Sequence, residues 1–272
     1  MENHSAPAYT DIETEVVQEH VARITLRRPD RMNAYTSEMA EELVRAITAF
    51  ARDDSLRVLV ITGEGRGFCS GGDVRSSVEI DMAHERVLGH ATVMREGFHP
   101  LTRLLRLLDK PVVGAINGPA VAGGLVLALL CDIRIASDRA TFGDPSGTVG
   151  LLPDEGGAWL FPRVMGLERA LRMTLLAESY DAQQALDLGI ISEVVPHDEL
   201  EAASLELAGR LAQRAPLATR LAKRLMVQAQ ESTVEQALAQ AELAVTITND
   251  SQDFAEGLES FMSRRSPHFE GR

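Results

Sequence analysis

Two apolar runs, each followed by a glycine-rich turn, constrain the fold of this chain more than any other feature. The first run, Val58–Thr62, leads into a turn that ends in Ser70-Gly71-Gly72-Asp73. The second, Pro111–Ile116, is followed by the turn Asn117–Gly124 and then directly by the apolar segment Leu125–Leu130. Continuous β-branched runs are typical of strands buried on both faces of a parallel-type sheet. The sequence therefore predicts an α/β fold, in which ligands bind where strands end and helices begin.

The glycines of both turns are placed where a backbone N–H group could be left free to point at a ligand. The start of the helix after Asn117–Gly124 has unpaired N–H groups and about half a positive charge, which suits a developing oxyanion. Two such donors aimed at one point form an oxyanion hole, often the largest contribution to catalysis on acyl groups. We therefore expect an oxyanion hole here, and ordinary glycine turns at strand ends are the alternative.

Polarity patterns extend the α/β alternation along the first half of the chain. Thr36 or Ser37 is placed to cap a helix, and a long helical region is expected from about Asp81 to Leu108. Further strands are expected at Ile12–Glu19, Val21–Arg27 and Asp132–Ala136.

From about Leu167 strand signals disappear and helical patterns dominate. Pro216 suits the first position of one of these helices. The expected helices are Asp181–Leu188, Leu200–Arg214, Pro216–Gln230, Val234–Thr248 and Asp253–Ser263.

Composition limits the classes of partner. The chain has 272 residues, 45% of them hydrophobic, and a net charge of −13 from 40 acidic and 27 basic residues, which argues against nucleic acid and anionic membranes. The longest apolar run, Leu125–Cys131, is too short to span a bilayer, and we find no secretory signal and no metal-ligand cluster. Cys69 and Cys131 lie in or beside apolar segments, which fits a reducing cytoplasm. We expect a cytoplasmic protein without nucleic-acid or membrane partners.

An ordered set of motifs resembles the crotonase, or enoyl-CoA hydratase/isomerase, superfamily over nearly the whole chain. The motifs are Arg28-Pro29-Asp30-Arg31-Met32-Asn33-Ala34, Gly67-Phe68-Cys69-Ser70-Gly71-Gly72-Asp73, Lys110–Gly118, Cys131-Asp132, Gly150-Leu151-Leu152-Pro153, and Glu256-Gly257 with Phe261, Arg265 and Pro267. The resemblance implies a spiral of β-β-α units over residues 1–195 and a helical trimerisation region over residues 196–272. It also implies a homotrimer or a dimer of trimers, and an acyl-CoA thioester as substrate, with coenzyme A entering only as part of that substrate.

The resemblance also implies roles for individual residues. The thioester oxygen would be held by the backbone N–H groups of Gly72 and Gly123, the same donors that the glycine argument favours. The coenzyme would lie along two loops, at Arg31, Met32, Ala34, Ser70, Gly71 and Asp73.

The departures from the family pattern bear on the reaction. Family hydratases carry one catalytic glutamate three residues after the oxyanion glycine, where this chain has Val126. They carry the other after a Phe-Gly-x-Pro pattern, where this chain has Ser146. Because both carboxylates are absent, the two-glutamate hydration mechanism is not available in its usual form.

Asp154 is the expected acid/base residue, because it matches the position where some family isomerases carry a catalytic aspartate. It lies between Pro153 and a Gly-Gly helix start, so it could instead cap the following helix. Glu155 is the first alternative base, although a neighbour on the same turn should point elsewhere, and Asp144 is the second. Cys69 is interpreted as a packing residue.

A single base suits allylic isomerisation, in which one group removes a proton next to the thioester and returns it two carbons away. The sequence therefore favours an enoyl-CoA double-bond isomerase. The alternatives are an enoyl-CoA hydratase with altered carboxylates, a hydrolase or decarboxylase of the same superfamily, and a catalytically silent acyl-CoA-binding member.

Overall fold

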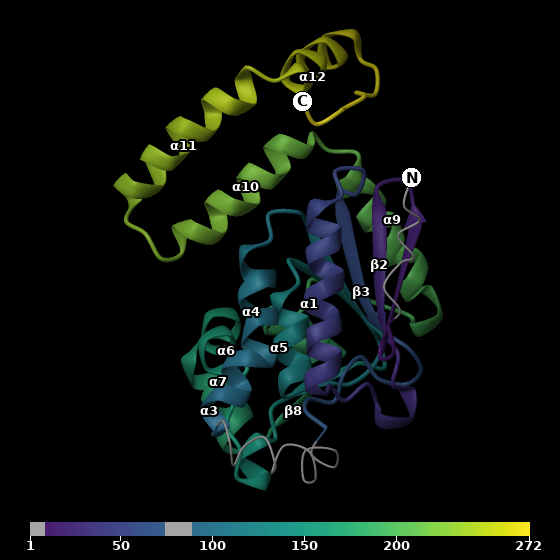
Figure 1. The fold of residues 1–272 in the computed structure, drawn as a ribbon, viewed down its shortest axis with the longest axis vertical. Coiled ribbons are helices and arrows are strands. Elements are labelled where there is room, and N and C mark those ends of the chain that lie inside the picture. Colours follow the sequence, from purple (N-terminus) through teal and green to yellow (C-terminus); the bar gives the residue numbers. More distant parts are fainter. Residues whose placement is uncertain (1–8, 74–88) are drawn as a thin grey trace.

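The computed structural model describes residues 9–73 and 89–272, and it confirms the expected α/β fold (Figure 1). Its main sheet has six strands in the order β1-β2-β3-β4-β6-β9. The pair β1/β2 is antiparallel and the other four pairs are parallel. The strands are β1 Ile12–Gln18, β2 Val21–Leu26, β3 Val58–Gly63, β4 Val112–Ile116, β6 Ile133–Ser137 and β9 Glu193–Val195.

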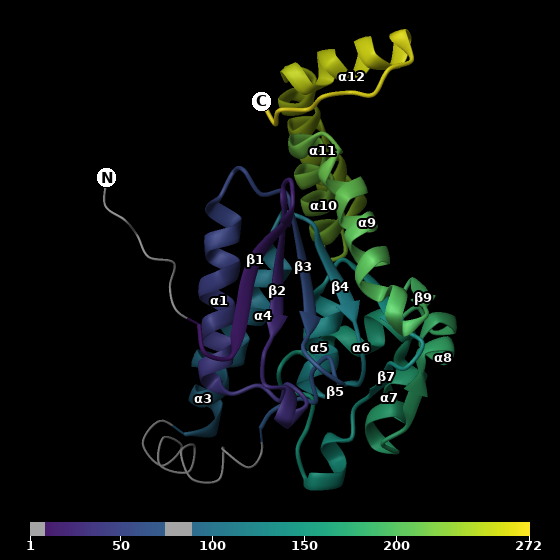
Figure 2. The same ribbon diagram turned by 90° about the vertical axis from the view of Figure 1, so that its right-hand side faces the viewer.

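Alternate residues of the central strands enter two separate cores, so both faces of the sheet are covered (Figure 2). On one face Leu59 and Ile61 pack with helices α1 (Ser37–Arg52), α4 (Phe98–Leu107) and α5 (Gly123–Leu130). On the other face Val58 and Val60 pack with α9 (Leu200–Ala212). This two-sided burial explains why β3 and β4 are continuous apolar runs.

The start of α1 is set by a capping side chain. The Thr36 side chain accepts a hydrogen bond from the backbone N–H of Met39, so Thr36, one of the two predicted caps, is the N-cap.

A smaller three-stranded sheet supports the turns that follow the main strands. It has the order β5-β7-β8, with β5 at Ala120–Val121, β7 at Thr141–Gly143 and β8 at Ser179–Asp181. The surrounding shorter elements are η1 Pro29–Arg31, η2 Ser146–Val149, α6 Gly157–Met165, α7 Leu167–Leu175, α8 Ala182–Asp187 and η3 His197–Glu199.

Two expectations about secondary structure are corrected. The predicted absence of strands after Leu167 is wrong, because β8 and β9 lie there, and three residues are too few to show a period. The helical region predicted from Asp81 falls partly outside the described residues. Its described part is divided at Gly97 into α3 (His90–Glu96) and α4.

Three C-terminal helices form an arm that projects from the α/β body (Figures 1 and 2). They are α10 Pro216–Ala229, α11 Val234–Asn249 and α12 Gln252–Ser263, and Pro216 is the first residue of α10, as expected. Lys223 fastens α10 to the body through an ion pair with Asp132 (2.6 Å). The preceding helix α9, predicted as part of the C-terminal helical region, packs on the sheet instead of joining the arm.

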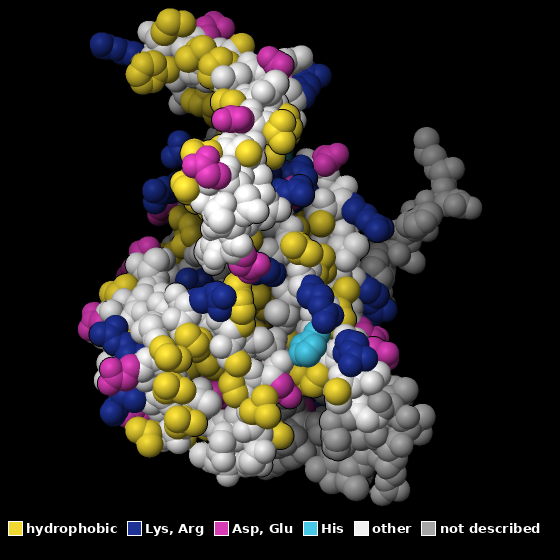
Figure 3. Space-filling model, turned by 90° about the vertical axis from the view of Figure 1, so that its left-hand side faces the viewer, with side chains coloured by type: hydrophobic (Ala, Val, Ile, Leu, Met, Phe, Trp, Pro, Cys, Tyr) yellow, Lys and Arg dark blue, Asp and Glu magenta, His cyan; other side chains and the backbone are white. Residues whose placement is uncertain are grey.

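The arm carries many exposed apolar side chains, and Figure 3 shows hydrophobic groups over this part of the molecule. Leu243 of α11 is 73% exposed and Phe261 of α12 is 83% exposed. Ala244 is the one residue of α11 that is buried. Among the described residues, no helix combines the length and the hydropathy needed to cross a bilayer.

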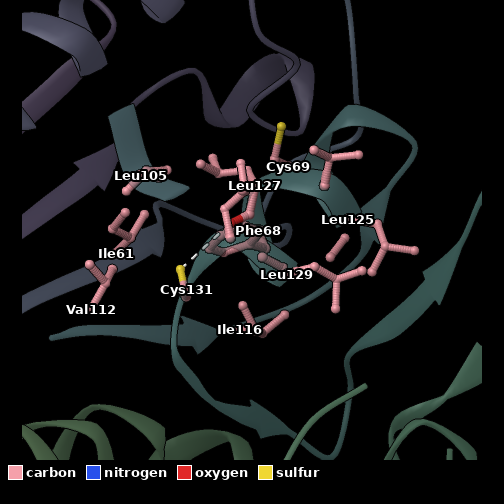
Figure 4. Packing of buried hydrophobic residues seen from close by; sticks show 14 of the residues in the cluster. Ile61, Phe68, Cys69, Leu105, Val112, Ile116, Leu125, Leu127, Leu129 and Cys131 are labelled. Atoms are coloured by element: carbon pink, nitrogen blue, oxygen red, sulfur yellow. Dashed lines mark hydrogen bonds between the residues drawn. The ribbon is translucent and has the colours of Figure 1, made fainter. Parts of the chain in front are cut away.

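Helix α5 lies inside the body with all eight of its residues buried. Figure 4 shows Leu125, Leu127 and Leu129 packed among side chains from the strands and from the loop at Phe68. A helix that is apolar on every side has no solvent face, and the N-terminus of α5 packs closely against the loop at Cys69.

Candidate active site

The first glycine turn is held against Tyr35 by two backbone hydrogen bonds. The backbone N–H of Tyr35 donates to the oxygen of Gly71 (2.9 Å), and the N–H of Asp73 donates to the oxygen of Tyr35 (2.9 Å). Tyr35 and Gly72 therefore form a parallel bridge. In a parallel bridge the hydrogen bonds use the residues on either side of the central one, here Gly71 and Asp73, so the N–H of Gly72 points away from the Tyr35 backbone.

The second glycine turn meets the first. Gly123 is the first residue of α5, so its N–H is one of the groups that have no partner within the helix. A Cβ atom built on Gly71 would lie 3.6 Å from the nitrogen of Gly123, and the N–H of Val121 donates to the oxygen of Cys69 (2.9 Å). The structure thus brings together the turns that carry the two predicted oxyanion donors, Gly72 and Gly123.

The space around Gly123 and Gly124 leaves no room for a side chain. A Cβ on Gly124 would lie 2.0 Å from the backbone oxygen of Cys69. A Cβ on Gly123 would lie 2.5 Å from two atoms, Glu155 Oε1 and Tyr35 Cε1. Gly123 therefore faces a carboxyl group and an aromatic ring directly.

The positions of the two hydratase glutamates are filled without a carboxylate. The Val126 side chain is fully buried. Ser146 donates through Oγ to Asp144 Oδ1 (2.5 Å), and Thr174 Oγ1 donates to Asp144 Oδ2 (2.8 Å). Asp144, the second alternative base, is completely buried and already accepts a hydrogen bond on each carboxylate oxygen.

The turn before α6 presents two carboxyl groups in opposite environments. Asp154 is exposed, whereas Glu155 is 6% exposed and faces Gly123. The two neighbours point in different directions, as expected, but the inward one is Glu155. The capping alternative for Asp154 is wrong, because the N-cap of α6 is Gly156 and no side chain caps this helix.

Helix α4 holds this turn in place. His99 donates through Nε2 to the backbone oxygen of Asp154 (2.9 Å), and Thr102 Oγ1 donates to the backbone oxygen of Glu155 (2.8 Å). Both contacts use main-chain oxygens, so they fix the turn without occupying either carboxyl group.

Tyr35 donates its hydroxyl proton to Glu155 Oε1 at 2.6 Å. Burial raises the pKa of Glu155 above its usual range, and the Tyr35 hydrogen bond opposes that change. Burial and the nearby Glu155 charge also raise the pKa of Tyr35 well above its usual value. The sequence did not indicate Tyr35 as a site residue. Only its pairing with Gly72 in the structure places it there.

The two loops predicted to bind the coenzyme are joined in the structure. Ser70 donates its backbone N–H to the oxygen of Met32 (3.1 Å) and its Oγ to the oxygen of Arg31 (3.4 Å). Arg28 links the loops a second time, binding Asp73 (2.9 Å) and the oxygen of Ala34 (2.5 Å). Arg31, Met32 and Ala34 thus lie beside Ser70, Gly71 and Asp73.

Cys69 is a packing residue, as interpreted from the sequence. Its side chain is 1% exposed, and burial raises the pKa of its thiol to about 12. A thiol with so high a pKa forms almost no thiolate at neutral pH, so it is a poor nucleophile.

Comparisons with known proteins identify the family of the chain. A sequence model of the family described as enoyl-CoA hydratase/isomerase matches residues 16–272. The chain is 36% identical to 2,3-dehydroadipyl-CoA hydratase of Escherichia coli K12 over 255 residues, covering 94% of this chain and 97% of that protein. It is also 36% identical to 1,2-epoxyphenylacetyl-CoA isomerase of the same strain over 256 residues, covering 94% and 97%. The crystal structure of an enoyl-CoA hydratase from Bacillus anthracis superimposes with a TM-score of 0.90 at 29% identity, covering 97% of this chain and 100% of that one.

Proposed function

The chain belongs to the enoyl-CoA hydratase/isomerase family, and within that family we propose that it is an enoyl-CoA double-bond isomerase with Asp154 as its acid/base residue. The observation that carries the proposal is the placement of carboxyl groups. Val126 and Ser146 occupy the hydratase positions, while the turn at Asp154 and Glu155 lies next to Gly123. The relatives include enzymes named for either reaction, so the choice between them depends on these residues.

In the proposed reaction the N–H groups of Gly72 and Gly123 bind the thioester oxygen. Their positive ends stabilise the negative charge that collects on this oxygen when a proton leaves the substrate. Asp154 accepts that proton, and the dienolate is reprotonated two carbons away, so the double bond moves without loss or gain of atoms. The coenzyme portion lies along the joined loops at Met32 and Ser70.

An enoyl-CoA hydratase is the second candidate, and the adjacent carboxyl groups of Asp154 and Glu155 favour it. Hydration requires one group to orient water and another to supply the α-proton. Asp154 and Glu155, two carboxyl groups on one turn, could supply both functions, although they lie at other positions than the two glutamates of the family hydratases. A catalytically silent acyl-CoA-binding protein would bind the thioester and turn it over in neither way.

A panel of 2-enoyl, 3-enoyl and ring-type CoA thioesters, followed by mass spectrometry and NMR, separates these candidates. Isomerisation leaves the mass unchanged and moves the double bond, whereas hydration adds one water. For the wild type we expect migration of the double bond without a change in mass. Hydration as the main reaction would favour the second candidate, and thioester binding without turnover would favour the silent protein.

The variant Asp154→Asn tests the proposed acid/base residue. Asparagine keeps the shape of the side chain but cannot accept the proton, so turnover should fall by roughly 10²–10⁴ while acyl-CoA binding persists. Asp198→Asn, an exposed change at η3, is the matched control and should be neutral. Near-normal turnover of Asp154→Asn would show that Asp154 is not the base.

A further inference from the structure

We propose that Glu155 is a second proton-transfer group, acting at the α-carbon of the thioester, and that the Tyr35 hydroxyl positions it. This inference rests on the proposed acyl-CoA chemistry and divides the proton transfers between two neighbours. Asp154 serves the γ-carbon and Glu155 the α-carbon.

The position of Glu155 relative to the glycines carries the assignment. Its Oε1 is 2.5 Å from where a Cβ on Gly123 would be, and a Cβ on Gly72 would be 3.4 Å from the Tyr35 hydroxyl. The Tyr35–Glu155 pair therefore borders both oxyanion donors. The α-carbon is bonded to the carbonyl carbon, so in a thioester held by these donors it would lie beside the Tyr35–Glu155 pair. Asp154, one residue earlier, is exposed, and the proposal assigns it to the γ-carbon, farther along the acyl chain.

The surroundings hold Glu155 in one orientation. Tyr35 is fixed by its backbone bridge to Gly72 and by contact with the Phe98 ring, whose centroid is 4.5 Å away. Thr102 fixes the backbone of Glu155 (2.8 Å). A carboxyl group held by its own backbone and by a rigid donor loses little conformational freedom when substrate binds.

The electrostatic environment suits a proton donor. Among the described residues, the ionisable groups that act on Glu155 are Asp154 and Asp144, which both raise its pKa, together with Tyr35 and the thiol of Cys69. Burial is the largest effect and acts in the same direction as the two aspartates. The hydrogen bond from the Tyr35 hydroxyl stabilises the ionised form and lowers the pKa of Glu155.

The proposed step is balanced without any other reactant. In the conversion of a 2-enoyl to a 3-enoyl thioester, Asp154 takes the γ-proton, and that C–H electron pair becomes the new β,γ double bond. The electron pair of the former α,β double bond forms a new C–H bond at the α-carbon with the proton that Glu155 donates. Asp154 then carries a proton and Glu155 is ionised, and proton exchange between these neighbours restores the starting state.

Deuterium exchange distinguishes one proton-transfer group from two. With 3-hexenoyl-CoA in D₂O, NMR measures exchange at the α-carbon separately from migration of the double bond. With two groups, Asp154→Asn stops migration but keeps α-exchange, whereas Glu155→Gln lowers both by roughly 10²–10⁴. With Asp154 alone, Asp154→Asn would abolish both processes and Glu155→Gln neither, which would overturn the inference.

The variant Tyr35→Phe tests the positioning role. It keeps the ring against Phe98 but removes the hydroxyl that stabilises ionised Glu155. The acidic limb of the α-exchange pH profile should therefore move to higher pH, with a loss of about tenfold near neutrality. Tyr9→Phe, a half-buried tyrosine outside the site, is the matched control. An unchanged profile in Tyr35→Phe would refute the positioning role.

Further outcomes keep this inference separate from the isomerase proposal. If wild type moves no double bond but its α-exchange depends on Glu155, the isomerase proposal fails and this inference stands. If Glu155→Gln does not fold, Glu155→Asp replaces it; this variant keeps the acid but shortens its reach, so α-exchange should fall more than binding. Wild type without α-exchange, or α-exchange unchanged in Glu155→Asp, would overturn the inference.

Discussion

At the scale of single residues, the candidate site depends on glycines, whose lack of a side chain lets other groups approach the backbone closely. Gly123 has no Cβ, and the place where one would stand is 2.5 Å from both Tyr35 and Glu155. The backbone N–H can therefore approach a ligand that an alanine or valine would push away. The same absence lets a tyrosine and a glutamate meet beside the proposed oxyanion donors.

Replacing Gly123 by valine should therefore damage the site twice. The new side chain displaces Tyr35 and Glu155 and disturbs the donor N–H, and loss of one oxyanion donor costs on the order of 10²–10³ in turnover. Steady-state kinetics on a variant confirmed as folded by circular dichroism measure the effect. A folded Gly123→Val protein that binds acyl-CoA with full activity would show that Gly123 is not a donor.

Buried Glu155 should also make stability depend on pH. Burial raises its pKa in the folded state, so the folded chain binds more protons than the unfolded chain above the usual glutamate pKa. Its contribution to stability is complete below that usual pKa and is lost as pH rises through the folded value. Denaturant unfolding of Glu155→Gln should thus show a smaller loss of stability between pH 4 and pH 8 than wild type. The prediction would be contradicted if the unfolding free energies of wild type and Glu155→Gln changed with pH in the same way.

At the scale of elements, helix α5 places the site because it is buried along its whole length. Its first two glycines lie against the loop at Cys69, and a Cβ on Gly124 would be 2.0 Å from a backbone oxygen there. Backbone cannot give way as a flexible side chain can, so this contact sets how closely the helix approaches the loop.

Gly124→Ala should consequently destabilise the protein. Forcing one methyl group into this contact resembles overpacking of a core, which typically costs about 1–3 kcal/mol. Gly147→Ala is the matched control, because the nearest atom to its added Cβ is 3.6 Å away, an ordinary contact. Urea unfolding of both variants gives the comparison, and equal midpoints would show that α5 can move away from the loop.

At the scale of the whole molecule, the arm is the feature that a single chain leaves unexplained. Its helices α11 and α12 expose Leu243, Leu258, Phe261 and Met262, and α11 buries only Ala244. Exposed apolar patches of this kind mark interaction surfaces. We propose that further copies of the chain cover them, which is the role that the family resemblance implies for this region.

We predict a stable oligomer in multiples of three. Sedimentation velocity at micromolar concentration should show a trimer or a hexamer, and Leu243→Glu should shift it toward monomer by placing a charge on the arm. Glu242→Gln, at the neighbouring exposed position, is the matched control and should leave the assembly intact. A monomeric wild type would refute this prediction.

The sequence by itself determined the features that depend on neighbouring residues. The runs at Val58 and Val112 predict buried parallel strands, Thr36 is a predicted cap, and the glycines at Gly72 and Gly123 predict free N–H groups. Each of these follows from local sterics, local hydrogen bonding or hydrophobic burial, and the structure agrees with the strands and the cap.

Only the tertiary structure decided which side chains meet. The strands β8 and β9 form because a neighbouring strand pairs with them, since three residues have no local preference strong enough to predict. The turn before α6 could have turned either carboxyl group inward, and its contacts with α4 decide that Glu155 is buried. Tyr35 reaches Glu155 across 120 residues of sequence, a distance at which no local pattern carries information.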